Sequence, residues 1–345
     1  MGAALQVRVV DEAALRAAVT PSVAVQAMRG AFRADGEGRT HVPPVINLDV
    51  PAARGEFHIK TALIDGCPRV AVKVASGFYD NPGKGLPSGS GLMAVFSAET
   101  GLPEALLLDN GFLTDIRTGA AGAIAADVLA PATIERVGIL GSGLQARHQV
   151  RCLREVRDFA QVIVWSPNAE HAQAYATEMQ REGYDVAVAA TPEAVCREAD
   201  VLITATPSRR SLVEAGWLHE GQHVTAVGSD SPGKQELDPV CLDRADLVVV
   251  DRYAQCSAFG ELKHALAAGL IARLDVHAEL GQIVAGLKTG RSSERQLTIV
   301  DLTGVGFQDT AIASAALDLL LDGAAGARRR SGPGQESGSA KPPGS

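Results

Sequence analysis

Residues 136–146 read Arg-Val-Gly-Ile-Leu-Gly-Ser-Gly-Leu-Gln-Ala. The apolar first half predicts a buried parallel strand, and the amphipathic residues from Gln145 to about Val156 predict a helix. Between them lies the pattern Gly141-x-Gly143-x-x-Ala146. A glycine turn that joins a strand to a helix is the context in which this pattern binds a dinucleotide. The alternative is a turn in an α/β unit that binds no nucleotide.

Each small residue of this turn has a physical use. Gly141 permits the tight turn, Gly143 lets backbone N–H groups approach a pyrophosphate, and Ala146 lets the helix pack closely on the strand. The helix N-terminus adds unpaired N–H donors and the positive end of a dipole. We therefore expect NAD or NADP as the cofactor. The residues expected to contact it are Gly141, Ser142, Gly143, Leu144, Gln145 and Ala146.

The composition is typical of a globular protein. The 345 residues are 46% hydrophobic and 21% charged, and this length favours two domains. A formal charge of −8 without a basic face argues against a nucleic-acid partner. The five cysteines lack CxxC spacing, so neither disulfides nor a metal site is expected. Without a signal-peptide pattern or an apolar run of membrane-spanning length, the expected location is the cytoplasm, away from membranes.

Before Arg136 the pattern is mixed. Thr20-Pro21 predicts the start of a helix to about Ala34, and a second helix is expected from Thr114 to Leu129. Between them, five short strands separated by turns predict a mostly antiparallel sheet. These strands are Val45–Leu48, Glu56–Ala62, Val70–Ala75, Gly91–Ala98 and Glu104–Leu108.

After Arg136, strands and helices alternate, which predicts a doubly wound parallel sheet of the Rossmann type. The chain closes with a helix from about Gln308 to Leu321. The Gly-, Ser- and Pro-rich residues 324–345 predict a disordered tail. The later strands are expected at Val162–Trp165, Val186–Ala189, Val201–Thr204, Val224–Val227, Leu247–Val250 and Thr298–Asp301.

Five segments, in this order, resemble the ornithine cyclodeaminase/μ-crystallin family. They read RVAVKVASGFYDNPGKGLPSGSG, LTDIRTGAAGAIAADVLA, GILGSGLQA, AVGSDSPGKQEL and DLTGVGFQDTAIASAA. The first two are most similar to the ectoine-utilisation and iminosuccinate-reductase branch. The resemblance implies a homodimer whose residues 132–305 bind NAD(P). It also implies a discontinuous α+β substrate-binding and dimerisation domain, formed by residues 1–131 and completed by 306–323. The implied chemistry is hydride transfer to or from an imine at an amino-acid α-carbon.

Lys73 lies between Val72 and Val74, so its side chain points to the opposite face of the strand. A lysine in such a place is usually exposed to solvent. In the family, the matching lysine contacts the substrate and serves in proton transfer, which makes Lys73 a catalytic and substrate-binding candidate. Ser88 stands where the cyclodeaminases have threonine, and the resemblance places it near the substrate.

Arg117 is expected in the first turn of the helix that begins near Thr114, where a cation opposes the helix dipole. This placement is reasonable if an anion binds there, because a guanidinium binds carboxylates bidentately. A surface ion pair with Asp115 is the alternative. The resemblance implies that Arg117 binds the substrate carboxylate and that Thr118 lies near the cofactor phosphates.

Asp230 follows an apolar strand and therefore lies at the carboxyl end of a parallel sheet, where ligands bind. A turn or cap aspartate is the alternative. The resemblance gives Asp230 a catalytic role in proton transfer, leaves Lys234 without a defined one, and places Asp309 near the nicotinamide of the cofactor.

Two positions depart from the family pattern. The upstream arginine of the cyclodeaminases has only Arg39 and Arg54 as candidates, neither in a matching register. Arg54 and Lys60 add positive charge where the ornithine-specific enzymes are apolar, so we expect both to bind substrate. Extra cations suit a second carboxylate better than a distal amine. This charge pattern favours an iminosuccinate-like dicarboxylate over ornithine.

The choice between NAD and NADP stays open. The strand at Val162–Trp165 ends in Ser166-Pro-Asn168, which we expect at the ribose, without the acidic residue that favours NAD or an arginine for the 2′-phosphate of NADP. The resulting hypothesis is an NAD(P)H-dependent reductase of an α-imino acid, iminosuccinate-like or derived from ectoine breakdown. A cyclodeaminase for ornithine or a related diamino acid, and a non-catalytic binding protein, are the alternatives.

Overall fold

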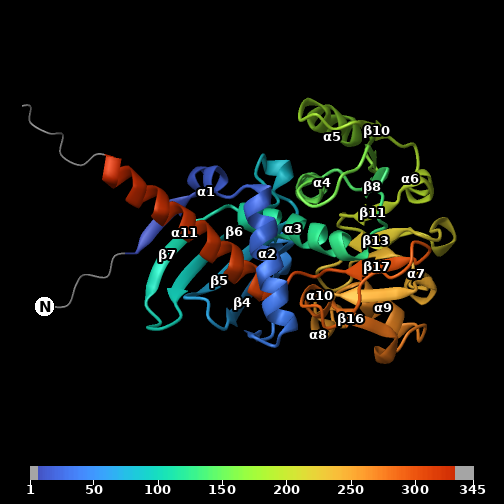
Figure 1. The fold of residues 1–345 in the computed structure, drawn as a ribbon. Coiled ribbons are helices and arrows are strands. Elements are labelled where there is room, and N and C mark those ends of the chain that lie inside the picture. The colour runs from blue at the N-terminus through green and yellow to red at the C-terminus, as the bar shows by residue number, and fades with distance from the viewer. Residues whose placement is uncertain (1–6, 331–345) are drawn as a thin grey trace, which may run out of the picture.

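The computed structural model describes residues 7–330 and contains two large β-sheets in adjacent halves of the molecule (Figure 1). The first third of the chain forms a mostly antiparallel sheet, and the residues from Arg136 onward form a parallel one. The predicted fold class, a Rossmann-type doubly wound parallel sheet beside an α+β unit, is confirmed.

Seven strands form the first sheet, in the order β1-β7-β6-β5-β4-β2, with β3 also paired to β4. Only β1 and β7 run parallel. The five predicted strands are present as β3 to β7, whereas β1 and β2 are too short to give a periodic sequence pattern. The bounds are β1 (Arg8–Asp11), β2 (Thr40–His41), β3 (Ile46–Val50), β4 (Gly55–Ile64), β5 (Arg69–Phe78), β6 (Gly89–Ser97) and β7 (Pro103–Leu108).

The second sheet has the order β10-β9-β8-β11-β13-β17-β15-β16, and all of its strands are parallel. From β8 the strand order runs to one side through β9 and β10, and the chain then returns to place β11 on the other side of β8. Ligands bind outside the carboxyl ends of the strands at such a switch in strand order. The bounds are β8 (Arg136–Leu140), β9 (Gln161–Trp165), β10 (Val186–Val188), β11 (Val201–Thr204), β13 (His223–Ala226), β15 (Leu247–Val250), β16 (Val276–Glu279) and β17 (Thr298–Asp301). A small separate sheet pairs β12 (Arg209–Val213) with β14 (Gln235–Leu237).

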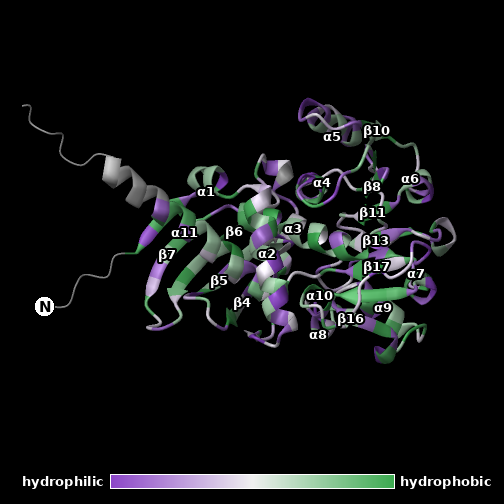
Figure 2. Ribbon diagram, in the orientation of Figure 1, coloured by the Kyte–Doolittle hydropathy of each residue, from purple (hydrophilic) through white to green (hydrophobic). Residues whose placement is uncertain are grey.

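Helices cover the sheets and connect them. Figure 2 shows hydrophobic residues concentrated in the strands, while outer helices such as α5 carry hydrophilic ones. The bounds are α1 (Glu12–Ala18), α2 (Pro21–Gly36), α3 (Phe112–Leu129), α4 (Leu144–Arg154), α5 (Ala169–Arg181), α6 (Pro192–Glu198), α7 (Val240–Arg244), α8 (Tyr253–Cys256), α9 (Glu261–Ala267), α10 (Leu280–Val284) and α11 (Gly306–Arg330).

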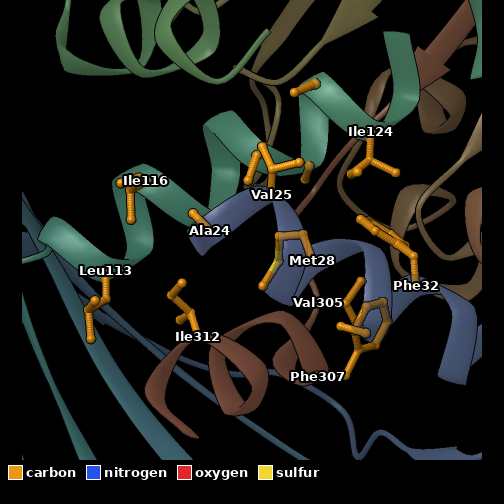
Figure 3. Close-up of a cluster of buried hydrophobic side chains, with 14 of the residues drawn as sticks. Ala24, Val25, Met28, Phe32, Leu113, Ile116, Ile124, Val305, Phe307 and Ile312 are labelled. Atoms are coloured by element: carbon orange, nitrogen blue, oxygen red, sulfur yellow. The ribbon is translucent and has the colours of Figure 1, made fainter. Parts of the chain in front are cut away.

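The last helix, α11, leaves the parallel sheet after β17 and packs against β4, β5 and α2 of the first sheet (Figure 1). Phe307 at its start meets Phe32 of α2 edge-to-face, with ring centroids 5.4 Å apart. Both rings are fully buried with Met28 and Val305 (Figure 3). Each buried ring contributes roughly 1.5–3 kcal/mol, so the C-terminal segment is part of the core of the N-terminal sheet.

Two glycines of α3 allow α4 to approach closely. A Cβ at Gly119 would lie 2.6 Å from the carbonyl oxygen of His148, and one at Gly122 would collide with the side chain of Gln149. The contact fixes α4, and with it the glycine turn at its N-terminus, relative to α3. Small residues in α3 therefore position the two functional segments next to each other.

The structure differs from the predictions at two helix ends. α3 begins at Phe112 rather than Thr114, so Arg117 lies beyond the first turn and does not oppose the dipole there as predicted. α11 continues to Arg330, past the predicted start of a tail at 324, because alanine and arginine favour helix. Residues 331–345, the rest of that predicted tail, lie outside the described part of the chain.

Cys67, Cys152, Cys196, Cys241 and Cys256 are all free thiols. Within residues 7–330, no three His, Cys, Asp or Glu side chains are grouped as a metal site would require. None of the helices described is both long and apolar enough to span a bilayer.

Candidate active site

A cavity of about 210 Å³ lies between the two sheets. Both halves of the molecule contribute to its wall: β4 and β5, the first half of α3, the N-terminus of α4, and the segments after β13 and β17. Its charged and polar lining comprises His58, Lys60, Lys73, Thr114, Asp115, Arg117, Thr118, Gln145, Asp230, Thr303 and Gln308.

Lys60 and Lys73 enter the cavity from adjacent strands. They are direct partners in the antiparallel register of β4 and β5, so their side chains leave the sheet on the same face. Both are buried, with Lys73 only 2% exposed. Lys60 donates to the carbonyl oxygens of Gly304 at 2.8 Å and Thr303 at 3.2 Å. Lys73 is therefore not the solvent-exposed lysine that its residue type alone favours.

Asp309 supplies the counter-charge from the first turn of α11. Lys73 Nζ donates to Asp309 Oδ1 at 3.0 Å and lies 2.9 Å from Oδ2, and Arg117 Nε donates to the same Oδ1 atom at 3.0 Å. The Asp309 side chain is fully buried and is not part of the cavity wall. Its carboxylate joins two cations of the cavity, and its predicted place near the nicotinamide stays a prediction.

Arg117 is held by a residue that the sequence analysis did not select. Its Nη1 group donates to Gln308 Oε1 at 2.8 Å, and its alternative partner Asp115 bonds to Gln145 instead. Among the described residues, the Nη2 group of Arg117 has no hydrogen-bond partner. The guanidinium therefore lines the cavity with donors still available to a carboxylate.

Burial and mutual repulsion shift the acid–base behaviour of these groups. Burial lowers the pKa of Lys73 to about 7, with Arg117 and Lys60 adding to the effect and Asp309 opposing it. Burial and the nearby Arg117 also lower the pKa of Lys60. Burial alone would raise the pKa of Asp309, but Lys73, Arg117 and Lys60 hold it below its usual value. Asp309 is consequently a carboxylate at neutral pH, while Lys73 exchanges its proton readily.

Asp230 lies on the opposite wall, in the loop after β13. Its Oδ1 atom accepts from Lys234 Nζ at 2.6 Å, which gives Lys234 the partner that the sequence could not assign. The loop is tied down by Glu236, whose fully buried carboxylate accepts from the N–H of Gly228 and from Thr206. Asp230 thus reaches the cavity as one member of an ion pair.

The glycine turn has the shape that a dinucleotide requires. Gly141 has φ +111° and its α-carbon lies so close to Ala205 that a Cβ would meet the carbonyl oxygen at 2.5 Å. At Gly143, by contrast, a Cβ would meet nothing within 4 Å. This open space precedes the N-terminus of α4, and Leu144 beside it is 60% exposed. Ala146 is buried beneath, so the residues fit a pyrophosphate group.

The remaining predicted cofactor residues lie around this turn. Thr118 and Gln145 line the cavity, and Gln145 Oε1 is buried without a partner among the described residues. Ser166 follows β9 and is half-buried. The side chain of Asn168 accepts from the backbone N–H groups of Glu170 and His171 and so caps α5.

Two predicted substrate-binding residues do not reach the cavity. Arg54 is 71% exposed and pairs with Asp80, and Ser88 is exposed in the loop between β5 and β6. In the described chain, neither is placed to contact a ligand beside Lys73. Lys60, the other cation expected there, does line the cavity, and beside it lies a residue that the sequence analysis missed, His58. Its two-residue spacing from Lys60 on β4 could have indicated the shared face.

A family model described as the ornithine cyclodeaminase/mu-crystallin family matches residues 6–323. An uncharacterised cyclodeaminase of Sinorhizobium fredii is 45% identical over 88% of this chain and 92% of its own. The alanine dehydrogenase of Archaeoglobus fulgidus is 39% identical over 84% of this chain and 88% of its own.

Two solved structures are similar to this protein over 92% of its chain. The Thermococcus litoralis Delta(1)-pyrroline-2-carboxylate reductase, in complex with NADH and L-proline, is 29% identical with a TM-score of 0.88 and 98% of its chain covered. The Paracoccus denitrificans iminosuccinate reductase, in complex with NAD+, is 30% identical with a TM-score of 0.84 and 97% covered. The chain belongs to the ornithine cyclodeaminase/mu-crystallin family.

Proposed function

We propose that the protein is an NAD(P)H-dependent reductase of a short α-imino acid, with an iminosuccinate-like dicarboxylate as the favoured substrate. The observation that carries the proposal is the meeting of Lys60, Lys73 and Arg117 in one cavity beside the glycine turn. The buried Asp309 balances only part of this charge. An anionic substrate would complete the balance, and the kinds of relative described above act on imino and amino acids.

Each side chain has a role consistent with its surroundings. Arg117 has free donors for the α-carboxylate, and Lys60 adds positive charge beside it. Lys73, with a pKa of about 7, gives a proton to the substrate nitrogen during reduction. Asp230 is paired with Lys234, so we assign it to orienting the substrate and not to donating the proton. A nicotinamide cofactor, when bound at Gly141–Ala146, supplies the hydride.

A cyclodeaminase is the second candidate, since a relative of that name is 45% identical. Its diamino substrate would bring a distal ammonium group into a cavity that already contains Lys60, Lys73 and Arg117. This charge pattern favours the dicarboxylate reductase. A binding protein without activity would not need a buried lysine whose pKa lies near 7, because that property serves proton transfer.

We also propose that the protein forms a homodimer through the first sheet. Three apolar residues of this sheet are strongly exposed: Val9 on β1 is 66% exposed, Leu48 on β3 is 58% exposed and Leu108 on β7 is 45% exposed. Apolar side chains exposed together on one sheet favour a protein partner. The structure of an archaeal alanine dehydrogenase dimer with bound NAD, 35% identical with a TM-score of 0.86 over 92% of this chain and 97% of its own, supports this assembly. Light scattering would measure the mass in solution.

The test of function follows cofactor absorbance with NADH and, separately, with NADPH. Oxidation that requires both oxaloacetate and ammonium would establish a dicarboxylate imine reductase and identify the nucleotide. Ammonia release from ornithine with catalytic NAD+ would establish a cyclodeaminase instead. If neither substrate reacts, an ectoine-derived imine is the next substrate to assay, and failure there as well would favour a binding role.

A further inference from the structure

We propose that His58 discriminates between substrates by the group at the far end of the substrate's side chain, and that it favours an anionic group there. The inference deepens the function proposed above and rests on it. His58 lines the same cavity as Lys60, Lys73 and Arg117, yet it lies outside the five segments that relate this chain to its family.

The strand register gives the cavity two levels. Lys60 faces Lys73 across the β4–β5 ladder, and His58 faces Ala75 one step further along the same face. Two residues of a strand span about 6.8 Å. The first level holds Arg117 and Lys60, which we assign to binding the α-carboxylate, and Lys73, which we assign to donating the proton. At the second level the small Ala75 leaves room next to the imidazole, and this offset suits the two ends of a four-carbon dicarboxylate.

The imidazole is held so that one nitrogen remains for a ligand. Nδ1 lies 2.7 Å from Oδ1 of Asn47, its direct partner on β3, and donates its proton there. Nε2 is 3.4 Å from Oε1 of Glu56, longer than a usual hydrogen bond. That oxygen already accepts from the hydroxyl of Tyr79 at 2.5 Å. Nε2 is therefore the ring nitrogen that His58 leaves for the cavity, and it donates to a substrate carboxylate when the ring carries both protons.

Lys60 is less suited to this selection because its ammonium group is already bonded. It donates to the carbonyl oxygens of both Thr303 and Gly304, which hold it at the first level. His58 is only 19% exposed and is packed beside Glu56 on the same strand. A rigid, oriented donor of this kind distinguishes substrates by the group it meets.

The test compares His58→Leu, His58→Gln and wild type with NADH. The substrates are oxaloacetate plus ammonium and pyruvate plus ammonium, whose imines differ in the second carboxylate. Loss of a charge-assisted hydrogen bond predicts that H58L raises KM for the dicarboxylate about tenfold or more, with less than about threefold change for pyruvate. H58Q, which keeps an N–H donor, should recover part of the difference. His41→Leu, which alters an exposed histidine on β2, is the matched control.

Retained turnover of pyruvate shows that a variant is folded and competent. Equal losses for the two substrates, or no loss for either, would overturn the role of His58 while the proposed reductase function stands. If the wild-type protein reduces neither imine, the proposed function fails and the inference fails with it. If H58L does not fold, the comparison of H58Q with wild type on the two substrates decides between these results.

Discussion

Lys60 and Lys73 are direct partners across the β4–β5 ladder, and both side chains are buried on the same face. Like charges directly opposite each other destabilise a sheet. Asp309 contacts only Lys73 of this pair. The pairing of the two lysines is therefore electrostatically unfavourable, and we expect an anion that enters the cavity to stabilise it.

We therefore expect a dicarboxylate to stabilise the protein against heat. Succinate at about one hundred times its dissociation constant should add about 2.7 kcal/mol to the free energy of unfolding. Differential scanning calorimetry at constant ionic strength measures the shift. Sodium chloride at matched ionic strength serves as the control, and an equal shift with that salt would argue against a specific anion site.

The pH dependence should report Lys73. In the oxidative direction the lysine must accept a proton, so kcat/KM for an amino acid should rise through a pH of about 7, the pKa of Lys73. In the reductive direction the protonated lysine is needed, and activity falls above the same pH. Because Lys60 lowers the pKa of Lys73, Lys60→Met should move this limb to higher pH. If the pH profile of K60M does not shift, a group other than Lys73 is responsible for the pH dependence.

Replacing Asp309 should destabilise the fold. Asp309→Asn leaves two buried cations without their shared counter-charge, which costs about 3–5 kcal/mol of unfolding free energy. It should also lower the pKa of Lys73 further. Urea denaturation measures the stability. Asp318→Asn, on the same helix but 60% exposed in its pair with Arg69, is the control and should change stability by less than about 1 kcal/mol.

The two glycines of the turn should respond differently. Gly141→Ala introduces a Cβ at positive φ and against the carbonyl of Ala205, so stability should fall by about 1–3 kcal/mol. Gly143→Val meets open space, so the melting temperature should hardly change. Fluorescence titration should nevertheless show NADH affinity reduced at least about tenfold. Unchanged affinity in G143V would place the nucleotide elsewhere.

Arg54 gives a prediction of no effect. Because its side chain is 71% exposed and paired with Asp80, Arg54→Ala should leave KM for oxaloacetate plus ammonium within about twofold of wild type. Steady-state kinetics beside Lys60→Met, which should raise KM strongly, provides the comparison. A large rise in R54A would show that the exposed guanidinium moves into the cavity when substrate binds.

Local patterns predicted the parts of the fold that local forces determine. The glycine turn and the apolar strands after Arg136 were read correctly because backbone conformation and periodicity fix them. The family resemblance added Lys73, Arg117 and Asp230, and all three line one cavity. The anion expected beside Arg117 is provided first by the protein itself, as Asp309, although Arg117 lies beyond the first turn of α3 on which that expectation rested.

What the sequence could not give was pairing over long distances. Lys73 and Asp309 are 236 positions apart, and no periodic pattern relates them. The link that Asp309 makes between Lys73 and Arg117 was consequently not predicted, and Gln308 was not named as a site residue. Arg54 was chosen for its charge. It lies in the turn before β4 and is exposed, whereas Lys60 lies within β4 and is buried. Such outcomes depend on tertiary packing, which charge and spacing do not encode.

The return of α11 to the first sheet sets an order for biosynthesis. During translation, β4 and β5 leave the ribosome more than two hundred residues before the helix that covers them and carries Asp309. The parallel sheet can form in the meantime, since its strands follow one another closely. The first sheet must wait with an apolar face uncovered, and contacts of such separation are slow to form. The cations Lys73 and Arg117 thus gain their counter-ion only when synthesis is nearly complete, and a chain that ends before α11 lacks both Asp309 and the helix that covers β4 and β5.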